Sequence, residues 1–361
     1  MRRIRHFPGT VVAAVVTVVV VAIAATGVSR VRAQPAPSLP PTTADQLLDS
    51  TITALALPHS VSGTVETTLD VGLPEIPDVL SGAAGGVGIT NVLGSVIGPQ
   101  RFRVWSSSDG IRIQHLMDLQ EQDLVANHAD AWFWDSASAT ATKLRAAGVT
   151  SAVPALPADA RSQMANADPM TIAKGLLDRV SACGDVTVTD TAVIAGRDAY
   201  MLRFTPSSHA TLVGDVTIAI DAQTHLPLDV SITPRGGSAP AMEAGFTSVS
   251  FAAIDPSMFA FTPPPDATVR DVTDEVSAAV SSATHRESEG SNEPRPITAG
   301  SCLDTSVAVP LRHPLPPGIS ALLPFTGPLG SAVMTERGGT TWLSFGPVDV
   351  ATLQARANAL P

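Results

Sequence analysis

Short segments in which apolar and polar residues alternate fill most of the chain between residues 61 and 251. Alternation places every second side chain on the same face of a β-strand, and these segments are rich in the β-branched residues that strands favour. Turn signals such as Asp109-Gly110 separate them, as expected for antiparallel neighbours. The pattern predicts strands at residues 61–69, 101–105, 111–117, 124–127, 131–135, 140–144, 186–194, 197–205, 214–221, 227–233 and 243–251.

Two helices are predicted around these strands. Thr43, followed by Gln46, forms a capping box in front of apolar residues that are spaced for one helix face, and Pro58 ends this helix near residue 57. The second helix is predicted at residues 168–182, where Pro169 suits the first turn. Residues 259–269 include three consecutive prolines, which donate no backbone hydrogen bonds, so this segment is expected to lie outside any sheet.

The end of the chain is predicted to form a small unit of its own. Residues 271–289 read as a polar connector, and residues 288–296 have the composition of a linker. Strands are predicted at 306–311, 331–335 and 340–345, followed by an amphipathic helix at 347–360. A piece of about sixty residues has a marginal core of its own, so we expect it to dock on the main sheet.

Residues 70–100 change character, because apolar residues are mixed there with many glycines and with prolines. A loop of about thirty residues is uncommon in a compact domain and is usually functional or disordered. One interpretation is a loop that folds back as additional core, and the other is a mobile apolar flap over the mouth of a cavity. A phosphate-binding loop fits poorly, since Gly86-Val-Gly88 runs on to Asn91 where a third glycine is required.

The N-terminus has the features of a targeting segment. Arg2, Arg3 and Arg5 precede an uncharged apolar run at residues 10–28, and Val31-Arg32-Ala33 offers small residues at the spacing that signal peptidase reads. A run of this length suits a cleaved signal peptide or a single-pass membrane anchor. Both alternatives for residues 1–33 place the rest outside the cytoplasm, either secreted or held at the cell membrane, after a Pro-rich tether at 34–43.

Cys183 and Cys302 are the two cysteines of the chain. In an oxidising compartment they suffice for one disulfide, and the alternative is a pair of buried thiols that never meet. A bridge would close a loop of about 120 residues, for which the chain-entropy model gives about 4 to 5 kcal/mol of stabilisation. It would also tie the C-terminal unit to the main body.

The residues that catalysis or metal binding would need are scattered. No serine has glycine two positions away on both sides, and the histidines are spread along the chain without metal-ligand spacing. The formal net charge is -11, which argues against a nucleic-acid partner. We therefore expect a protein that is not an enzyme and that has no cofactor, no metal site and no nucleic-acid partner.

Alternating apolar positions are the candidates for lining a ligand cavity. Alternation shows that the members of each set share a side of the sheet, and it leaves open whether a ligand or ordinary core covers that side. Two tryptophans on one strand carry the same two alternatives. The candidates are Val65, Leu69, Phe102, Val104, Ile111, Ile113, Trp132, Trp134, Leu202, Phe204, Ile218, Ile220, Val230 and Ile232.

Several of these segments, in this order, resemble a known family. They are the Phe102-Arg-Val-Trp strand, the Trp132-Phe-Trp-Asp-Ser strand, the hairpin Ile194-Ala-Gly-Arg-Asp-Ala-Tyr200, the turn from Ile220 to Pro227, and the strand at residues 243–251 followed by Asp255-Pro-Ser-Met-Phe and Phe261-Thr-Pro-Pro-Pro. Together they resemble the superfamily of the periplasmic lipoprotein carrier LolA and the sigma-E regulator RseB. The likeness covers roughly residues 44–269.

The resemblance implies a mainly β (α+β) fold. It consists of a strongly curved antiparallel half-barrel sheet with helices in its concavity, plus a small C-terminal α+β unit that resembles the second domain of RseB-like proteins. The expected boundaries are a half-barrel domain at 44–287, a linker at 288–299 and the small domain at 300–361.

The resemblance also implies a function outside the cytoplasm. It is the non-covalent binding of a lipid, an acyl chain or a lipoprotein in a carrier or sorting role. The alternative is an RseB-like sensor that regulates an anti-sigma factor or another membrane protein, for which two domains and a retained anchor are suited. A shared fold does not choose between these functions.

Overall fold

The computed structural model describes residues 36–70, 72, 99–117, 119–145, 181–278, 296–311, 315, 320 and 322–361. The predicted targeting segment at 1–33, almost all of the predicted flap at 70–100 and residues 168–180 of the second predicted helix lie outside the described residues. The same is true of residues 288–295 of the predicted linker. Within the described part, no helix combines the length and the apolar character that crossing a bilayer requires.

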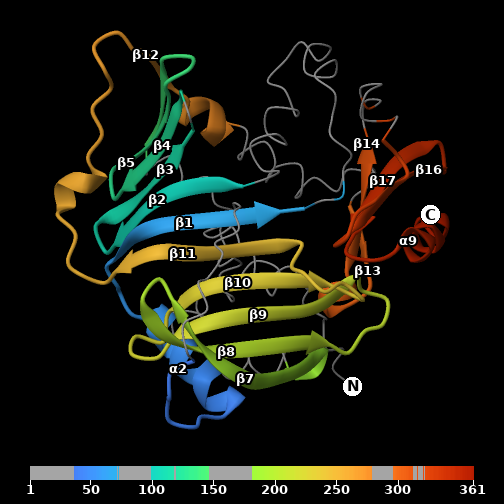
Figure 1. Ribbon diagram of the computed structural model, residues 1–361. Coiled ribbons are helices and arrows are strands. Elements are labelled where there is room, and N and C mark those ends of the chain that lie inside the picture. Colours follow the sequence, from blue (N-terminus) through green and yellow to red (C-terminus); the bar gives the residue numbers. More distant parts are fainter. Residues whose placement is uncertain are drawn as a thin grey trace, which may run out of the picture.

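The larger of two sheets has twelve strands in the order β12-β6-β5-β4-β3-β2-β1-β11-β10-β9-β8-β7 (Figure 1). The pairings are antiparallel except that of β12 with β6, which is parallel. The predicted strands of this region are confirmed, with ends that differ by a few residues. The strands are β1 (Val61–Leu69), β2 (Gln100–Ser107), β3 (Gly110–Leu116), β4 (Glu121–Asn127), β5 (Asp130–Asp135), β6 (Thr140–Arg145), β7 (Gly184–Ile194), β8 (Arg197–Pro206), β9 (Val213–Asp221), β10 (Pro227–Pro234), β11 (Met242–Ser250) and β12 (Thr268–Asp271).

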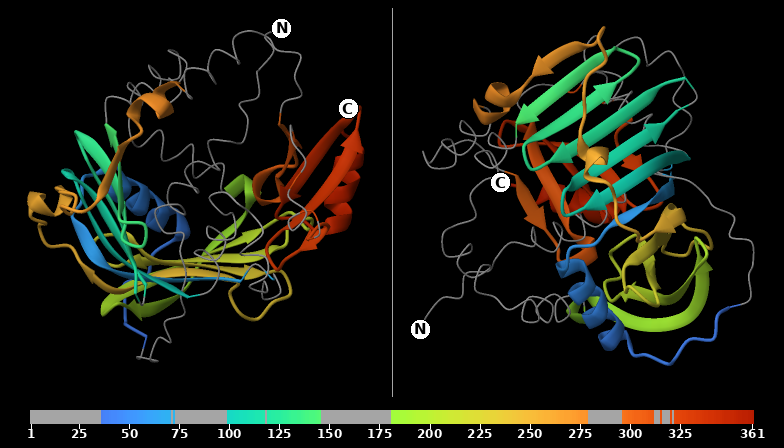
Figure 2. Two further views of the ribbon diagram at one scale, coloured as in Figure 1. Left: turned by 90° about the horizontal axis from the view of Figure 1, so that it is seen from above. Right: turned by 90° about the vertical axis from the view of Figure 1, so that its left-hand side faces the viewer.

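The sheet bends into an open trough, and helix α2 (Ala44–Ala56) lies on its inner side (Figure 2). The predicted capping box is present, because the Thr43 side chain accepts from the Gln46 backbone and the Gln46 side chain accepts from the Thr43 backbone. Leu47 of α2 is buried in a cluster with Tyr200, Leu202 and Ile220. We call the face of the sheet that carries this cluster the inner face and the opposite one the outer face. The predicted half-barrel with a helix in its concavity is confirmed.

The Pro-rich segment before α2 is docked on the sheet over part of its length. Thr191 Oγ1 donates to the carbonyl oxygen of Pro37 at 2.7 Å, and the Tyr200 hydroxyl donates to that of Pro40 at 2.9 Å. Leu39 packs on the same apolar cluster as Leu47. A free tether was expected here, but proline carbonyls remain good acceptors and the apolar Leu39 side chain gains by burial.

A second segment crosses the outer face. The short helix η2 (Pro256–Phe259) contacts β3 and β4, and Phe259 is 1% exposed. Asn127 Nδ2 donates to the Phe259 carbonyl oxygen at 2.8 Å, which fixes the segment to the end of β4. Gly110 permits this approach, because a Cβ atom there would lie 3.0 Å from Phe259 side-chain atoms.

The expectation that residues 259–269 stay outside any sheet is wrong at their end. Strand β12 begins at Thr268 and runs parallel to β6, with Val269 paired to Ala141. The Thr268 backbone N–H donates to the Ala139 carbonyl at 2.8 Å. The prolines end at Pro265, so the following residues have N–H groups that can complete the sheet edge.

The C-terminal residues form a separate five-stranded sheet with the order β13-β14-β17-β16-β15. Helix α9 packs on one face of it through Leu353 and Ala357 against Val333. The predicted strands and the helix are confirmed, and β13 and β15 are additional. The elements are β13 (Ile297–Ala299), η3 (Cys302–Asp304), β14 (Ser306–Leu311), β15 (Phe325–Thr326), β16 (Ser331–Arg337), β17 (Thr340–Gly346) and α9 (Val350–Asn358).

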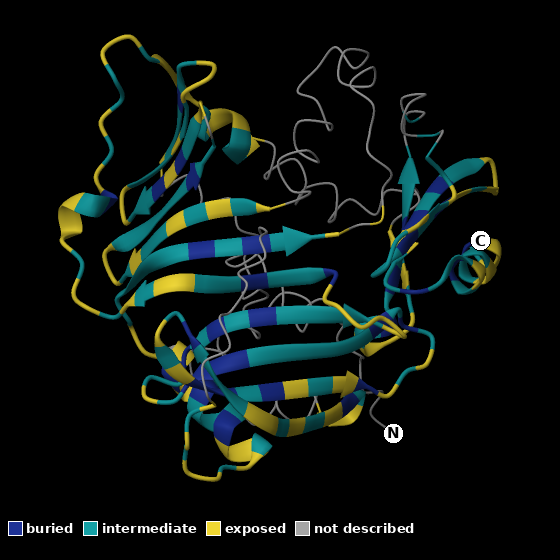
Figure 3. Cartoon of the chain, in the orientation of Figure 1, coloured by how far each residue is buried: buried dark blue, intermediate teal, exposed yellow. Residues whose placement is uncertain are grey.

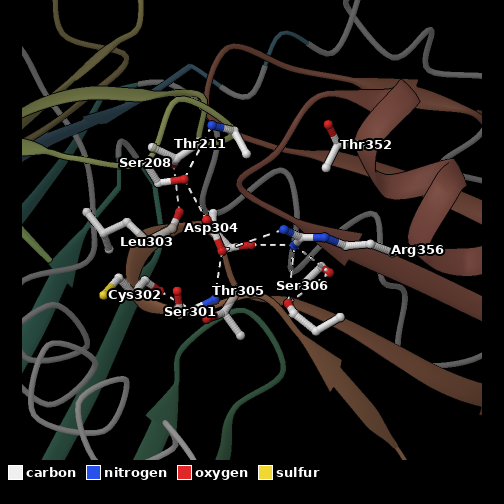
Figure 4. A network of polar contacts seen from close by, with 12 residues as sticks. Ser208, Thr211, Ser301, Cys302, Leu303, Asp304, Thr305, Ser306, Thr352 and Arg356 are labelled. Carbon is white, nitrogen blue, oxygen red and sulfur yellow. Dashed lines mark hydrogen bonds and ion pairs between the residues drawn. The ribbon is translucent and has the colours of Figure 1, made fainter.

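Covalent and polar contacts join the two sheets. Cys183 and Cys302 form the predicted disulfide, with a Cα–Cα distance of 5.6 Å. Beside it, Thr211 Oγ1 donates to the carbonyl oxygen of Leu303 at 2.7 Å, and Ser208 Oγ donates to Asp304 Oδ2 (Figure 4). The small sheet is therefore docked on the main one, as its size led us to expect.

Candidate functional site

The register of the main sheet decides which predicted side chains share a face. Residues directly opposite one another in an antiparallel pair point to the same side. Val65 lies opposite Phe102, and Val104 lies opposite Ile113. On the other half of the sheet, Ile218 lies opposite both Leu202 and Val230. Carried from strand to strand, this register places on the inner face Val65, Leu69, Phe102, Val104, Ile111, Ile113, Leu202, Phe204, Ile218, Ile220, Val230 and Ile232.

The two predicted tryptophans lie on the opposite, outer face. Trp132 is paired with Val125, which is paired with Arg112, one position away from the inner-face residue Ile113. The Trp132 ring lies 5.5 Å from that of Phe261, in the segment that crosses the outer face, and the Trp134 ring lies 6.5 Å from it. The structure therefore does not bring Trp132 and Trp134 together with the other candidates. Both rings instead lie beside Phe261, in the segment that crosses the outer face.

Two exposed apolar residues of the inner face, Leu124 and Phe133, were not among the candidates. Leu124 lies opposite both Ile113 and Phe133, and the side chains of Leu124 and Phe133 remain 38% and 41% exposed. Both sit beside other apolar residues, in Leu124-Val125 and in the run from Trp132 to Trp134, so alternation in the sequence does not show which member of each run faces inward. A preference for the larger aromatic side chain selects the wrong face here.

The inner face is covered unequally. Leu47 of α2 packs on Tyr200 and Leu202, so the helix occupies the β7–β9 end. Over β2 to β5 the principal contact of a described helix is that of η2, on the outer face. Figure 3 shows mostly intermediate and exposed positions in these strands, with few buried ones. The described helices thus leave an apolar surface of these strands uncovered on the inner face, and Leu124 and Phe133 are part of it.

Polar side chains interrupt this apolar surface at one place. His115, which is 6% exposed, stacks on Phe102 with ring centroids 4.5 Å apart. Its Nε2 lies 2.6 Å from Gln100 Oε1, and Thr67 lies opposite Gln100 in the register. Burial lowers the pKa of His115 and outweighs the hydrogen bond with Gln122 that acts to raise it. Burial therefore favours the neutral form of the imidazole.

Two buried carboxylates of the described residues are held by arginines. Asp123 is buried on the outer face and pairs with Arg112, whose Nη2 lies 2.6 Å from Asp123 Oδ2. Asp221 is likewise paired with Arg197 and accepts from the backbone of Thr224. Within the described residues, no three His, Cys, Asp or Glu side chains are grouped to hold a metal ion.

Several solved structures are similar to this chain over more than half of its length. MucB from Pseudomonas aeruginosa, in a complex with MucA, is 14% identical over 87% of this chain and 96% of that one, with a TM-score of 0.44. A LolA superfamily protein from Nitrosomonas europaea is 10% identical over 61% and 99% of the two chains, with a TM-score of 0.21. A putative outer membrane lipoprotein-sorting protein domain from Vibrio parahaemolyticus is 11% identical over 60% and 97%, with a TM-score of 0.23.

No protein-family model matches the sequence, and no curated protein matches it either. The structures to which the chain is similar are nevertheless of the LolA-like and RseB-like kinds that its motifs resemble. The curved sheet of this chain is given by its own strand pairings, and its ligand must likewise be argued from its own residues.

Proposed function

We propose that this chain is an extracytoplasmic binding protein for a lipid, an acyl chain or a lipoprotein, and that it acts as a carrier without a catalytic step. The observation that carries the proposal is the apolar inner face over β1 to β5, where Leu124 and Phe133 lie opposite each other and stay exposed. Side chains of this kind are normally buried, and a contiguous exposed group of them is typical of a binding surface.

The free energy available from such a surface is sufficient for a single chain. Each buried methylene group contributes about 0.8 kcal/mol, so a sixteen-carbon chain would gain on the order of 12 kcal/mol before the cost of ordering it. The Val, Ile and Phe side chains that β1 to β3 place on the inner face would contact such a chain. No covalent bond to the ligand is needed.

Native mass spectrometry of the purified protein from Gln34 onward, followed by lipid extraction, tests the proposal. A lipid that co-purifies in stoichiometric amount supports it. Leu124→Asp should then abolish lipid retention, because it places a charge on the inner face at a position exposed enough to tolerate it. Leu119→Asp is the matched control, since Leu119 is 96% exposed in the turn between β3 and β4. Retention that is equal in both variants argues against this face as the binding surface.

A specific observation favours a second candidate, a sensor that binds a membrane protein. Met334 and Phe345 are 42% and 44% exposed, and both lie on the face of the small sheet opposite α9. We propose that residues 300–361 form a domain separate from residues 44–287, and that this apolar face would serve as its docking surface. The disulfide Cys183–Cys302 would hold that surface in a fixed position beside the main sheet.

The two candidates differ in what a substitution on the small sheet does. Phe345→Asp should weaken recovery of the protein with washed membranes from its own host if the sensor proposal is right, and it should leave lipid retention unchanged. Leu119→Asp again controls for an added charge. If Phe345→Asp has no effect on membrane recovery while Leu124→Asp abolishes lipid retention, the carrier proposal stands alone.

A further inference from the structure

The polar group formed by Thr67, Gln100 and His115 stands out on the apolar inner face. Thr67 is 1% exposed, and its Oγ1 is buried without a hydrogen-bond partner among the described residues. By register Thr67 points to the same side as Val65 and Leu69, which belong to the apolar surface. A buried hydroxyl without a partner is unfavourable, and in native proteins such a group calls for an explanation.

The neighbours of Thr67 are already fixed by other contacts. His115 stacks on Phe102, and its Nε2 lies 2.6 Å from Gln100 Oε1. Gln122, opposite His115 in the register, also hydrogen bonds with the imidazole. Thr67, Gln100 and His115 thus form a polar patch on the inner face. Within it, the Thr67 hydroxyl lacks a hydrogen-bond partner among the described residues.

Charge is segregated between the two faces of the sheet. Every Arg and Lys in strands β1 to β11 of the described residues lies on the outer face by alternation and register, among them Arg101, Arg112 and Lys143. Arg101 pairs there with Glu66, and Lys143 lies over the Trp132 ring. A phosphate or carboxylate headgroup would therefore find no cationic side chain on the inner face of these strands, and its burial would be costly.

We propose that Thr67, Gln100 and His115 form a polar subsite for an uncharged headgroup, such as the hydroxyl or ester of a neutral acylglycerol, whose chain lies along the apolar rows beside it. This inference rests on the proposed lipid-binding function and adds to it the chemical class of the lipid. The ligand oxygen partners the Thr67 hydroxyl, and the neutral imidazole and the carboxamide supply further donors and acceptors. An anionic amphiphile with the same chain is disfavoured.

The experiment uses probes that separate the chain from the headgroup. Diphenylhexatriene, a fluorescent hydrocarbon, reports on the apolar surface, and 1-oleoylglycerol and oleate displace it with the same acyl chain and different headgroups. Thr67→Val removes the hydroxyl at almost constant volume. Thr68→Val is the matched control, because the Thr68 hydroxyl is equally buried and unpaired but lies on the outer face, opposite Glu243.

We expect 1-oleoylglycerol to displace the probe from the unaltered protein at lower concentration than oleate at pH 8, where oleate is ionised. Thr67→Val should weaken displacement by 1-oleoylglycerol about 3- to 10-fold, as for the loss of one hydrogen bond, and leave affinity for diphenylhexatriene unchanged. Thr68→Val should change neither.

The outcomes distinguish the two proposals. If the unaltered protein does not bind diphenylhexatriene, the apolar surface is not a binding site and both fail. If the probe binds and oleate displaces it as well as 1-oleoylglycerol does, the subsite is not selective for a neutral headgroup and only this inference fails. Equal effects of Thr67→Val and Thr68→Val on displacement would also overturn it.

Discussion

Ser208 Oγ donates a hydrogen bond to Asp304 Oδ2 at 2.5 Å, across the junction between the two sheets. Asp304 is 9% exposed, and its other carboxylate oxygen accepts from the Ser301 backbone N–H at 2.7 Å. Arg356 of α9 lies 3.6 Å from the same carboxylate and donates to the Asp304 carbonyl oxygen. Asp304 of η3 therefore links the loop after β8 to α9 (Figure 4).

Ser208→Ala should weaken this junction. It leaves a buried carboxylate with one partner fewer, and a hydrogen bond to a charged group contributes about 1.5 to 3 kcal/mol. Hydrogen exchange should show loss of protection in η3 and β14, with β1 to β6 unchanged. Ser108→Ala in an exposed turn is the control. Equal protection of η3 and β14 in the two variants would mean that the docking of the small sheet does not depend on this hydrogen bond.

The same junction should be sensitive to acid. Burial acts to raise the pKa of Asp304, but the hydrogen bonds from Ser208 and Ser301 and the charge of Arg356 outweigh it and hold that pKa below its usual value. The folded state thus favours the ionised form, so the contribution to stability is present above the unfolded-state pKa and is lost as the pH falls through the folded-state value. Thermal unfolding between pH 6 and pH 3 should show a smaller decrease for Asp304→Asn than for the unaltered protein.

Reduction of the disulfide should lower stability more than any single hydrogen bond at the junction. Cys183 and Cys302 are 119 positions apart, and the chain-entropy model assigns a loop of this size about 4 to 5 kcal/mol. Denaturant unfolding of the oxidised protein and of the Cys183→Ser, Cys302→Ser double variant measures the difference. A difference below about 1 kcal/mol would show that the polar contacts alone fix the small sheet.

Asp229 should make the protein less stable in mild alkali. Burial raises its pKa to about 7, with a further contribution from the charge of Glu243. The native state therefore retains a proton that the unfolded chain loses, so stability falls as the pH rises from about 4 through 7. Asp229→Asn should be on the order of 2 to 4 kcal/mol more stable than the unaltered protein at pH 8 and similar to it at pH 4.

Urea unfolding at these two values of pH measures that effect. Asp109→Asn, in an exposed turn, is the control and should show no such difference between the two conditions. An Asp229→Asn variant that gains nothing at pH 8 would show that the carboxylate of Asp229 is solvated in the folded protein.

Trp132 and Phe133 should separate stability from ligand binding. Trp132→Ala removes a ring that packs on Phe261 on the outer face, and we expect it to cost about 2 to 4 kcal/mol while lipid is still bound. Phe133→Ala removes an inner-face ring that is 41% exposed, so it should cost less stability and weaken lipid retention. Chemical denaturation and lipid extraction of both variants measure the two effects, and the opposite pattern would reverse the assignment of the faces.

Much of the secondary structure could be predicted from sequence patterns that span only a few residues. Thr43 and Gln46 capped α2, alternation placed the strands, and turn residues separated them. These features depend on residues within a few positions of each other, so no distant contact is needed to predict them. The same holds for the sets that share a side within one strand, such as Phe102 with Val104 or Ile218 with Ile220.

Tertiary structure decided which side of each strand faces inward. Val65 pairs with Phe246, on a strand far along the chain, and alternation within a strand carries no information about that pairing. Residues 132–134 are all aromatic, so the sequence does not show which of them face the inside of the sheet. The packing of Trp132 on Phe261 identifies its side as the outer one. The docked Pro37 and Pro40 carbonyls and the parallel strand β12 depended in the same way on partners that only the folded sheet brings within reach.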